Sequence, residues 1–153
     1  RERLLLQIAV LLHDCGKYIN MAQSSVCSYN IIMATEIIGL SHAEREMVAN
    51  VVRFNSSLFM SYEELAAGSL LDREEYLIIA KLTAILRVAN ALDRSHKQKI
   101  KDIKVSMKGG HTMQILVDTA EDLTLEQALF REKAEFFEEV YSIRPVLKAK
   151  KLL

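Results

Sequence analysis

Apolar residues recur at helical spacing along the first part of the chain. Residues 4–12 are apolar on nearly every side, which is typical of a helix buried within a helical domain. A second helix is expected over about residues 29–38, and a third begins at the capping box that Ser41 opens. The longest predicted helix is capped by Asp72 and runs to about Leu92. The front of the chain is therefore predicted to be all helical.

At Lys99 the apolar period changes from helical to alternating, which indicates a switch to β-structure. Two strands are expected over residues 101–107 and 113–117, with Gly109-Gly110 as a two-residue hairpin loop between them. A last strand is expected over about residues 143–150. A proline within that strand limits ladder hydrogen bonds and favours an edge position.

The helix between the hairpin and the last strand is expected to begin at a further capping box, opened by Thr124. Its predicted apolar face is formed by Leu125, Leu129, Phe136 and Val140. The tail thus reads β-β-α-β. The fold class is mostly α (α+β), with a helical part at residues 1–98 and the tail at residues 99–153 packed on it as one unit.

Composition indicates one sizeable core, because the chain has 153 residues and half of them are apolar. No run is long enough to span a membrane, and the first helix lacks the cleavage site of a signal peptide. Cys15 and Cys27 lack the spacing of a disulfide framework or a CxxC motif, so reduced thiols and a cytoplasmic location are expected.

The 20 basic residues balance the 20 acidic ones, which argues against a general nucleic-acid binder. The charges are nevertheless unevenly placed. Residues 94–108 carry six cations against Asp102 alone, whereas residues 121–139 are strongly acidic. These segments form either two solvated faces or, in the first case, a local basic patch for a polyanion.

A polar pair, His13 and Asp14, ends the first helix. Burying an imidazole or a carboxylate without partners costs several kcal/mol, so both side chains need hydrogen-bond partners or a metal. Gly16 is expected to close the helix in the left-handed conformation, and Lys17 places a cation at the negative end of the helix dipole. Imidazole and carboxylate suit a transition metal, which would need further ligands from other helices.

A hydrophobic helix ending in His-Asp-x-Gly-Lys resembles the HD superfamily of metal-dependent phosphohydrolases. In that pattern, residues 86–95 look like the stretch that carries the closing metal-binding aspartate, and the residue here is Asn90. A neutral amide oxygen is a weaker ligand than a carboxylate. The family's first histidine has no counterpart before His13. The resemblance implies a partial or relic metal site that retains His13 and Asp14, with manganese, zinc or magnesium as the candidate ion.

A closer resemblance covers nearly the whole chain. It rests on the order of short motifs: the His-Asp pair, Ser28-Tyr29, Val52-Arg53-Phe54, residues 86–94, the hairpin, and residues 125–141 with their Phe-Phe-Glu-Glu-Val core. This order is similar to the C-terminal region of the exopolyphosphatase and guanosine pentaphosphate phosphatase (Ppx/GppA) family. In that family the hydrolytic site lies in N-terminal actin-like domains, and this chain has no Gly-rich phosphate-binding loop.

The resemblance implies an accessory region whose partners are those N-terminal catalytic domains. It would hold polyphosphate or another polyanionic phosphate ligand, form the contact of a homodimer, or both. The candidate phosphate-binding residues are Lys17, Arg53, Arg87 and Arg94, because a guanidinium matches phosphate oxygens in a bidentate fork. Surface ion pairing is the other interpretation of these cations.

Two further functions stay open at this stage. The first is an active metal-dependent HD phosphohydrolase acting on nucleotides, in which a metal-activated water attacks the phosphate. The second is a purely structural or protein-interaction module, which the neutral net charge and the acidic amphipathic helix would suit.

Overall fold

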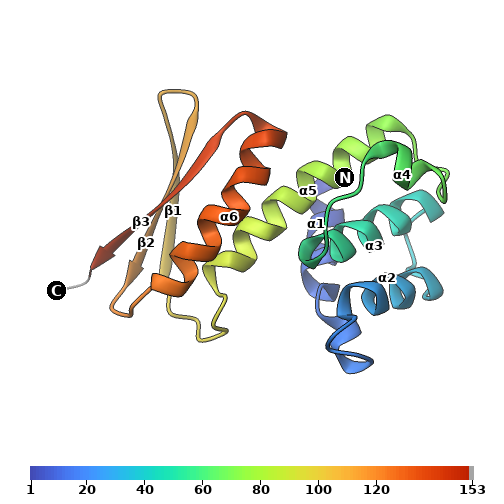
Figure 1. Ribbon diagram of the computed structural model, residues 1–153, viewed down its shortest axis with the longest axis horizontal. Coiled ribbons are helices and arrows are strands. Elements are labelled where there is room, and N and C mark those ends of the chain that lie inside the picture. The colour runs from blue at the N-terminus through green and yellow to red at the C-terminus, as the bar shows by residue number, and fades with distance from the viewer. Residues whose placement is uncertain (152–153) are drawn as a thin grey trace. The chain divides into compact units, whose positions relative to one another are not determined.

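The computed structural model describes residues 1–151, and Figure 1 labels its helices and strands. The chain divides into two compact units, Arg1–Leu86 and Arg87 to the C-terminus, and the division falls within helix α5 (Arg73–Leu92). The fold class is mostly α with one small sheet, as the sequence predicts. Within residues 1–151, no helix combines the length and the apolar character needed to cross a bilayer.

The first unit is helical and packs around α3. Its elements are α1 (Glu2–Leu12), the 3₁₀ turn η1 (Cys15–Tyr18), α2 (Ser24–Ala34), α3 (His42–Ser56), α4 (Tyr62–Ala66) and most of α5. Both α1 and α2 contact α3. Val48, Val51 and Phe54 on α3 are completely or almost completely removed from solvent, so α3 provides the centre of this core.

Two helices of this unit begin at the capping residues that the sequence predicts, Ser41 and Asp72. Ser41 Oγ accepts from the backbone N–H of Glu44 at 3.1 Å, and the Glu44 carboxylate accepts from the backbone N–H of Ser41 at 2.8 Å. Asp72 and Glu75 exchange the same pair of bonds, both at 2.9 Å. Each pair satisfies two amides that the first turn of a helix leaves without partners.

Helix α2 begins and ends earlier than the predicted range of 29–38. The cause lies in the preceding loop, where the side-chain oxygen of Asn20 accepts from the backbone N–H groups of Ala22 and Gln23. This local turn prepares a helix start at Ser24. At the other end, Thr35 is extended and closes the helix before the predicted end.

The second unit carries the predicted β-β-α-β tail. Its elements are β1 (Asp102–Lys108), β2 (Thr112–Thr119), α6 (Thr124–Tyr141) and β3 (Arg144–Lys151). The strand order is β1-β2-β3, with β1 antiparallel and β3 parallel to β2. The predicted edge position of the last strand is thus confirmed. Figure 1 shows α6 lying along the sheet.

The hairpin loop has three residues instead of the predicted two. Lys108 pairs with Thr112, which leaves Gly109, Gly110 and His111 between the strands. Both glycines have positive φ, at 60° and 76°. Such angles are strained for residues with a Cβ, so the Gly-Gly pair still sets the position of the turn.

Helix α6 differs from its prediction at its start. The residue before its first turn is Leu123, which offers no side-chain cap, and the Thr124 hydroxyl instead donates to Asp122 Oδ1 at 2.7 Å. The capping box predicted at Thr124 is therefore wrong. The helix begins at Thr124 itself, one residue earlier than a threonine cap requires, so the Thr124 hydroxyl does not cap the first turn.

The buried face of α6 also differs from the predicted one. Phe130, Ala134 and Phe137 are buried, whereas Leu125 is 55% exposed. Phe130 and Ala134 face β3 across the space between α6 and the sheet, whereas Phe136 of the predicted face contacts Arg87. The buried face of α6 is therefore shifted by about one residue along the helix from the face that the sequence predicted.

Candidate functional site

The His13-Asp14 pair follows the end of α1. His13 Nδ1 lies 2.6 Å from the carbonyl oxygen of Val10. Because a carbonyl oxygen can only accept, Nδ1 carries the proton and Nε2 holds the lone pair in the neutral ring. His13 Nε2 lies 3.7 Å from Asp14 Oδ2, which is too long for a hydrogen bond. The two side chains thus lie close together without a direct hydrogen bond.

The same Asp14 oxygen is bound by a lysine. Lys17 Nζ lies 2.8 Å from Asp14 Oδ2, and the two side chains are about two-fifths exposed, at 37% and 43%. An ammonium group therefore occupies the side of Asp14 that faces His13. A divalent ion held by His13 and Asp14 would have to displace this cation.

The residues around the pair do not complete a ligand set. Across residues 1–151, no group of three or more His, Cys, Asp and Glu side chains is arranged to hold a metal ion. Cys15 and Cys27 are half-buried free thiols. Asn90, the residue that stands where the HD pattern has aspartate, belongs to the second unit. Within the described residues, His13 and Asp14 therefore lack the third protein ligand that a zinc site requires.

Gly16 has a different role from the predicted one. It does not adopt a positive φ but lies in the turn η1, where its N–H donates to Ser28 Oγ at 2.8 Å. A Cβ at this position would collide with the backbone of α2 at Ser24 and Ser28. Glycine is required because two backbones approach closely, and this packing fixes the turn that carries Lys17.

The predicted phosphate-binding cations of the first unit have neighbours of their own. Lys17 is paired with Asp14, and the Arg53 guanidinium lies 5.5 Å from the centroid of the Tyr29 ring. Burial raises the pKa of Tyr29, and Glu46 adds to that rise. Each of these two cations therefore has a neighbouring side chain that holds it in place.

The second unit holds the other two predicted cations. The Arg87 guanidinium stacks 4.5 Å from the centroid of the Phe136 ring, and burial lowers its pKa. Arg94 is exposed on the turn that follows α5. Of these two, Arg94 is the side chain that solvent reaches more freely.

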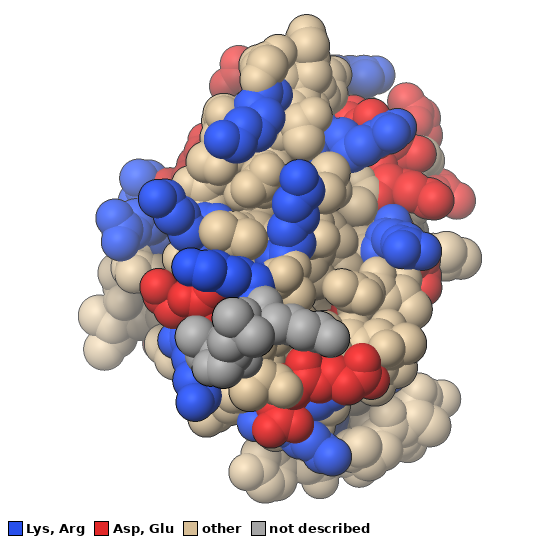
Figure 2. All heavy atoms as spheres, turned by 90° about the vertical axis from the view of Figure 1, so that its left-hand side faces the viewer, with Lys and Arg blue, Asp and Glu red and all other residues tan. Residues whose placement is uncertain are grey.

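The outer face of the sheet carries a basic cluster that the predictions included only in part, because Lys104 and Lys108 belong to the predicted basic segment 94–108 and Lys148 and Lys150 do not. Side chains alternate between the faces of a strand, and Pro145, Ile115 and Val117 are buried on the face toward α6. The opposite face carries exposed lysines from both edge strands: Lys104, Lys108, Lys148 and Lys150. We call these four residues the lysine face. Figure 2 shows basic side chains gathered on this side of the molecule.

The strand register sets the spacing of the lysine face. Lys104 and Lys148 both pair with Leu116 from opposite sides, so they are two strand spacings apart, about 10 Å. Asp102, Asp118 and Lys150 share another row. Alternating lysines in the last strand were visible in the sequence, but a sequence alone does not say that β3 joins β2 in parallel.

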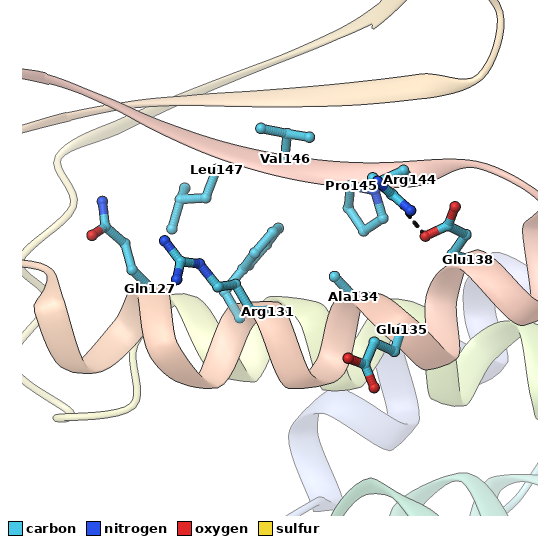
Figure 3. A pocket seen from close by; sticks show the side chains of 10 residues that line it. Gln127, Arg131, Ala134, Glu135, Glu138, Arg144, Pro145, Val146 and Leu147 are labelled. Carbon is cyan, nitrogen blue, oxygen red and sulfur yellow. Dashed lines mark hydrogen bonds and ion pairs between the residues drawn. The ribbon is translucent and has the colours of Figure 1, made fainter.

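A pocket of about 440 Å³ lies between α6 and β3 (Figure 3). Pro145 and Leu147 point into it, and Val146 points to the other side of the sheet. At one end Arg144 Nε pairs with Glu138 Oε2 at 2.9 Å. Charges of both signs line this pocket, so its chemistry favours no simple anion or cation.

A buried carboxylate on α6 binds the segment between α5 and β1. Glu126 is completely buried and accepts from the Ser95 hydroxyl at 2.6 Å and from Lys99 Nζ at 3.1 Å. Burial by itself raises the pKa of Glu126, but the hydrogen bonds from Ser95 and Lys99 outweigh it and lower the pKa to about 2. Glu126 is therefore a structural anion and no proton donor near neutral pH.

The sequence of the whole helical front and most of the tail matches one known family. The family model described as Ppx/GppA phosphatase, domain III, matches residues 1–135. The chain belongs to the Ppx/GppA phosphatase family. A comparison with curated proteins gave no match.

As a domain III of this family, the chain belongs with the other domains of a parent phosphatase. The match includes the His13-Asp14 pair, the hairpin and the first two thirds of α6, and it ends before β3. Lys104 and Lys108 thus lie within the matched residues, and Lys148 and Lys150 lie beyond them.

Proposed function

We propose that this Ppx/GppA domain is an accessory domain that holds an anionic phosphate chain, while hydrolysis takes place in the N-terminal actin-like domains of its parent. The observation that carries the proposal is the bond between Lys17 and Asp14 Oδ2. Lys17 neutralises the carboxylate that a metal ion would use, which supports the interpretation that the pair is a relic of a metal site. A lysine ammonium is also a group that binds phosphate oxygens.

The lysine face supports the binding part of the proposal. Polyphosphate carries negative charge along its whole length, and lysine ammonium groups on an exposed face attract such a chain without a shaped pocket. Lys104 and Lys148 are about 10 Å apart, so one extended chain can contact several of these lysines. Of the four cations predicted earlier, Arg94 is exposed and remains a candidate contact.

The experiment is a binding titration of the chain with fluorescent polyphosphate at several salt concentrations. Lys148→Glu is expected to raise Kd about tenfold, equivalent to about 1.4 kcal/mol, and to reduce the salt dependence. Arg3→Glu makes the same change in net charge on exposed α1 and is the matched control, expected to alter Kd by less than about twofold. Equal effects of the two variants would contradict the lysine face as the binding surface.

The second candidate is an active HD phosphohydrolase acting on nucleotides with a divalent metal. It is favoured by one observation, the bond from His13 Nδ1 to Val10, since metal-bound histidines commonly donate their other nitrogen to a carbonyl oxygen. Nucleotide hydrolysis with added manganese that His13→Ala abolishes would establish it. Our proposal predicts no hydrolysis by either protein.

We also propose that the parent is a cytoplasmic protein, in keeping with the free thiols of Cys15 and Cys27. Alkylation of the protein as it is isolated from cells tests this: both thiols should react without reduction once the chain is unfolded.

A further inference from the structure

Strand β1 is an edge strand with an exposed apolar side. Ile103, Val105 and Met107 lie on one side of the strand and remain 45%, 56% and 50% exposed. The strand contains no proline, and its seven residues pair continuously with β2. Three charged side chains, Asp102, Lys104 and Lys108, are its only protection, so another strand can add to this edge where its own charges complement them.

The backbone of β1 offers regularly spaced groups on its open side. The N–H of Ile103 donates to Asp102 Oδ1 at 2.9 Å, so it points away from β2. Hydrogen-bonding direction alternates along an antiparallel strand. The N–H and C=O groups of Ile103, Val105 and Met107 therefore point to the open edge, ready to form a ladder.

We propose that β1 pairs antiparallel with β1 of a second copy of this chain, about a two-fold axis at Val105, and joins the two sheets into one six-stranded sheet. The inference rests on the exposed edge of β1 and on the charges along it, and it does not depend on the proposed phosphate binding. In this register Ile103 lies opposite Met107 of the second copy, and Val105 lies opposite its own counterpart. The three apolar side chains of each copy then cover those of the other.

Charge selects this register. Antiparallel pairing about Val105 places Asp102 opposite Lys108 of the second copy, and symmetry repeats that pair. Opposite charges directly across two strands stabilise pairing, and like charges oppose it. Asp102 would release the N–H of Ile103, which the new ladder then satisfies.

The neighbouring registers are disfavoured by the same side chains. A shift that keeps the outward groups paired moves the strands by two residues of register. In one direction Lys104 meets Lys104 of the second copy, and in the other Lys104 meets Lys108. Both shifts also shorten the ladder, so the pairing about Val105 has the most contacts and the fewest repulsions.

A small apolar pocket lies beside the proposed contact. It has a volume of about 370 Å³ and is lined by Ala89, Leu92, Asp93, Gln98, Ile100 and Ile103. Since Met107 of the second copy lies opposite Ile103, its flexible side chain can enter this pocket. The strand pairing and the pocket thus accept the same partner.

The first test measures the dimer dissociation constant of the 153-residue chain by sedimentation equilibrium, without polyphosphate. Asp102→Lys or Lys108→Asp alone places like charges opposite each other twice per dimer, and each is expected to raise Kd about tenfold. The double variant exchanges the two charges, restores both pairs, and is expected to return Kd to within about threefold of the original. Rescue by the double variant is a result that simple misfolding does not give.

The second test locates the two-fold axis. Val105→Cys places two thiols on opposing residues, whose Cα atoms would be about 5.5 Å apart, and mild oxidation should link the copies. Ser106→Cys is the control, because its copies would be about 8 Å apart and face the other side of the sheet. The unchanged chain controls for Cys15 and Cys27.

A monomer at high concentration that Val105→Cys fails to link would overturn the proposal. A dimer whose Kd ignores both charge reversals would also overturn it, because another surface would then hold the copies together. Neither outcome involves Lys148, so failure of this interface and failure of polyphosphate binding are told apart.

Discussion

Position 16 has no room for a side chain. Gly16 lies so close to the backbone of α2 that a methyl group would collide with Ser24 and Ser28. Gly16→Ala should therefore lower the free energy of unfolding by about 2 kcal/mol or more, because backbone cannot move aside cheaply. Gly68→Ala is the control, since nothing lies within 4 Å of its added Cβ. Denaturant unfolding of both variants measures the difference, and equal stabilities would contradict the close approach.

The pKa of Glu126 predicts how stability depends on pH. Its folded pKa of about 2 lies below the ordinary value of 4.5. The ionised carboxylate therefore stabilises the fold at pH values above 4.5, and this contribution is lost as pH falls toward 2. Glu126→Gln should cost about 3 kcal/mol at pH 7, and its deficit should shrink on acidification. Denaturant unfolding at several pH values measures this, and a deficit that stays constant down to pH 3 would contradict it.

The sequence reveals some residue roles and hides others for a physical reason. Ser41 and Asp72 were predictable because a cap and its partner lie three residues apart. Gly16 and Glu126 owe their roles to Ser28 and Lys99, which are distant in sequence. Only the folded chain brings such partners together.

At the scale of the element, the caps provide the sharpest comparison. Ser41→Ala should destabilise the protein by about 1 kcal/mol, because the N–H of Glu44 then has no side-chain acceptor. Thr124→Ala removes only a hydroxyl that donates to Asp122 in solvent, and should cost less than about 0.5 kcal/mol. Thermal and denaturant unfolding of the two variants measure both values. A larger loss at Thr124 would mean that this residue caps α6 after all.

Elements with a strict period were predictable, and their orientation was less so. The two strands of the hairpin were predicted with the correct sides, since Ile103 pairs with Val117 and Val105 with Ile115. Helix α6 has apolar residues on more than one side, so its period allows two faces. The packing of Phe130 against the rest of the unit decides between them, and a helical period does not contain that information.

At the scale of the whole molecule, the family was visible in the order of its motifs, and the family match confirms it. The His13-Asp14 pair was also visible in the sequence. Its pairing with Lys17, which neutralises the charge of Asp14, was seen only in the structure. The lysine face depends on the parallel pairing of β3 with β2. The features that support the proposed function thus depend on contacts that form only when the chain folds.

The central claim is that this domain binds a phosphate chain and does not cut it. ³¹P NMR of polyphosphate mixed with the chain tests both halves at once, in the presence of manganese and in the presence of a chelator. The account predicts broadened signals of internal phosphates under both conditions and a constant ratio of end to internal phosphates. Sharp, unchanged internal signals, or end groups and orthophosphate that accumulate with manganese and not with the chelator, would contradict it.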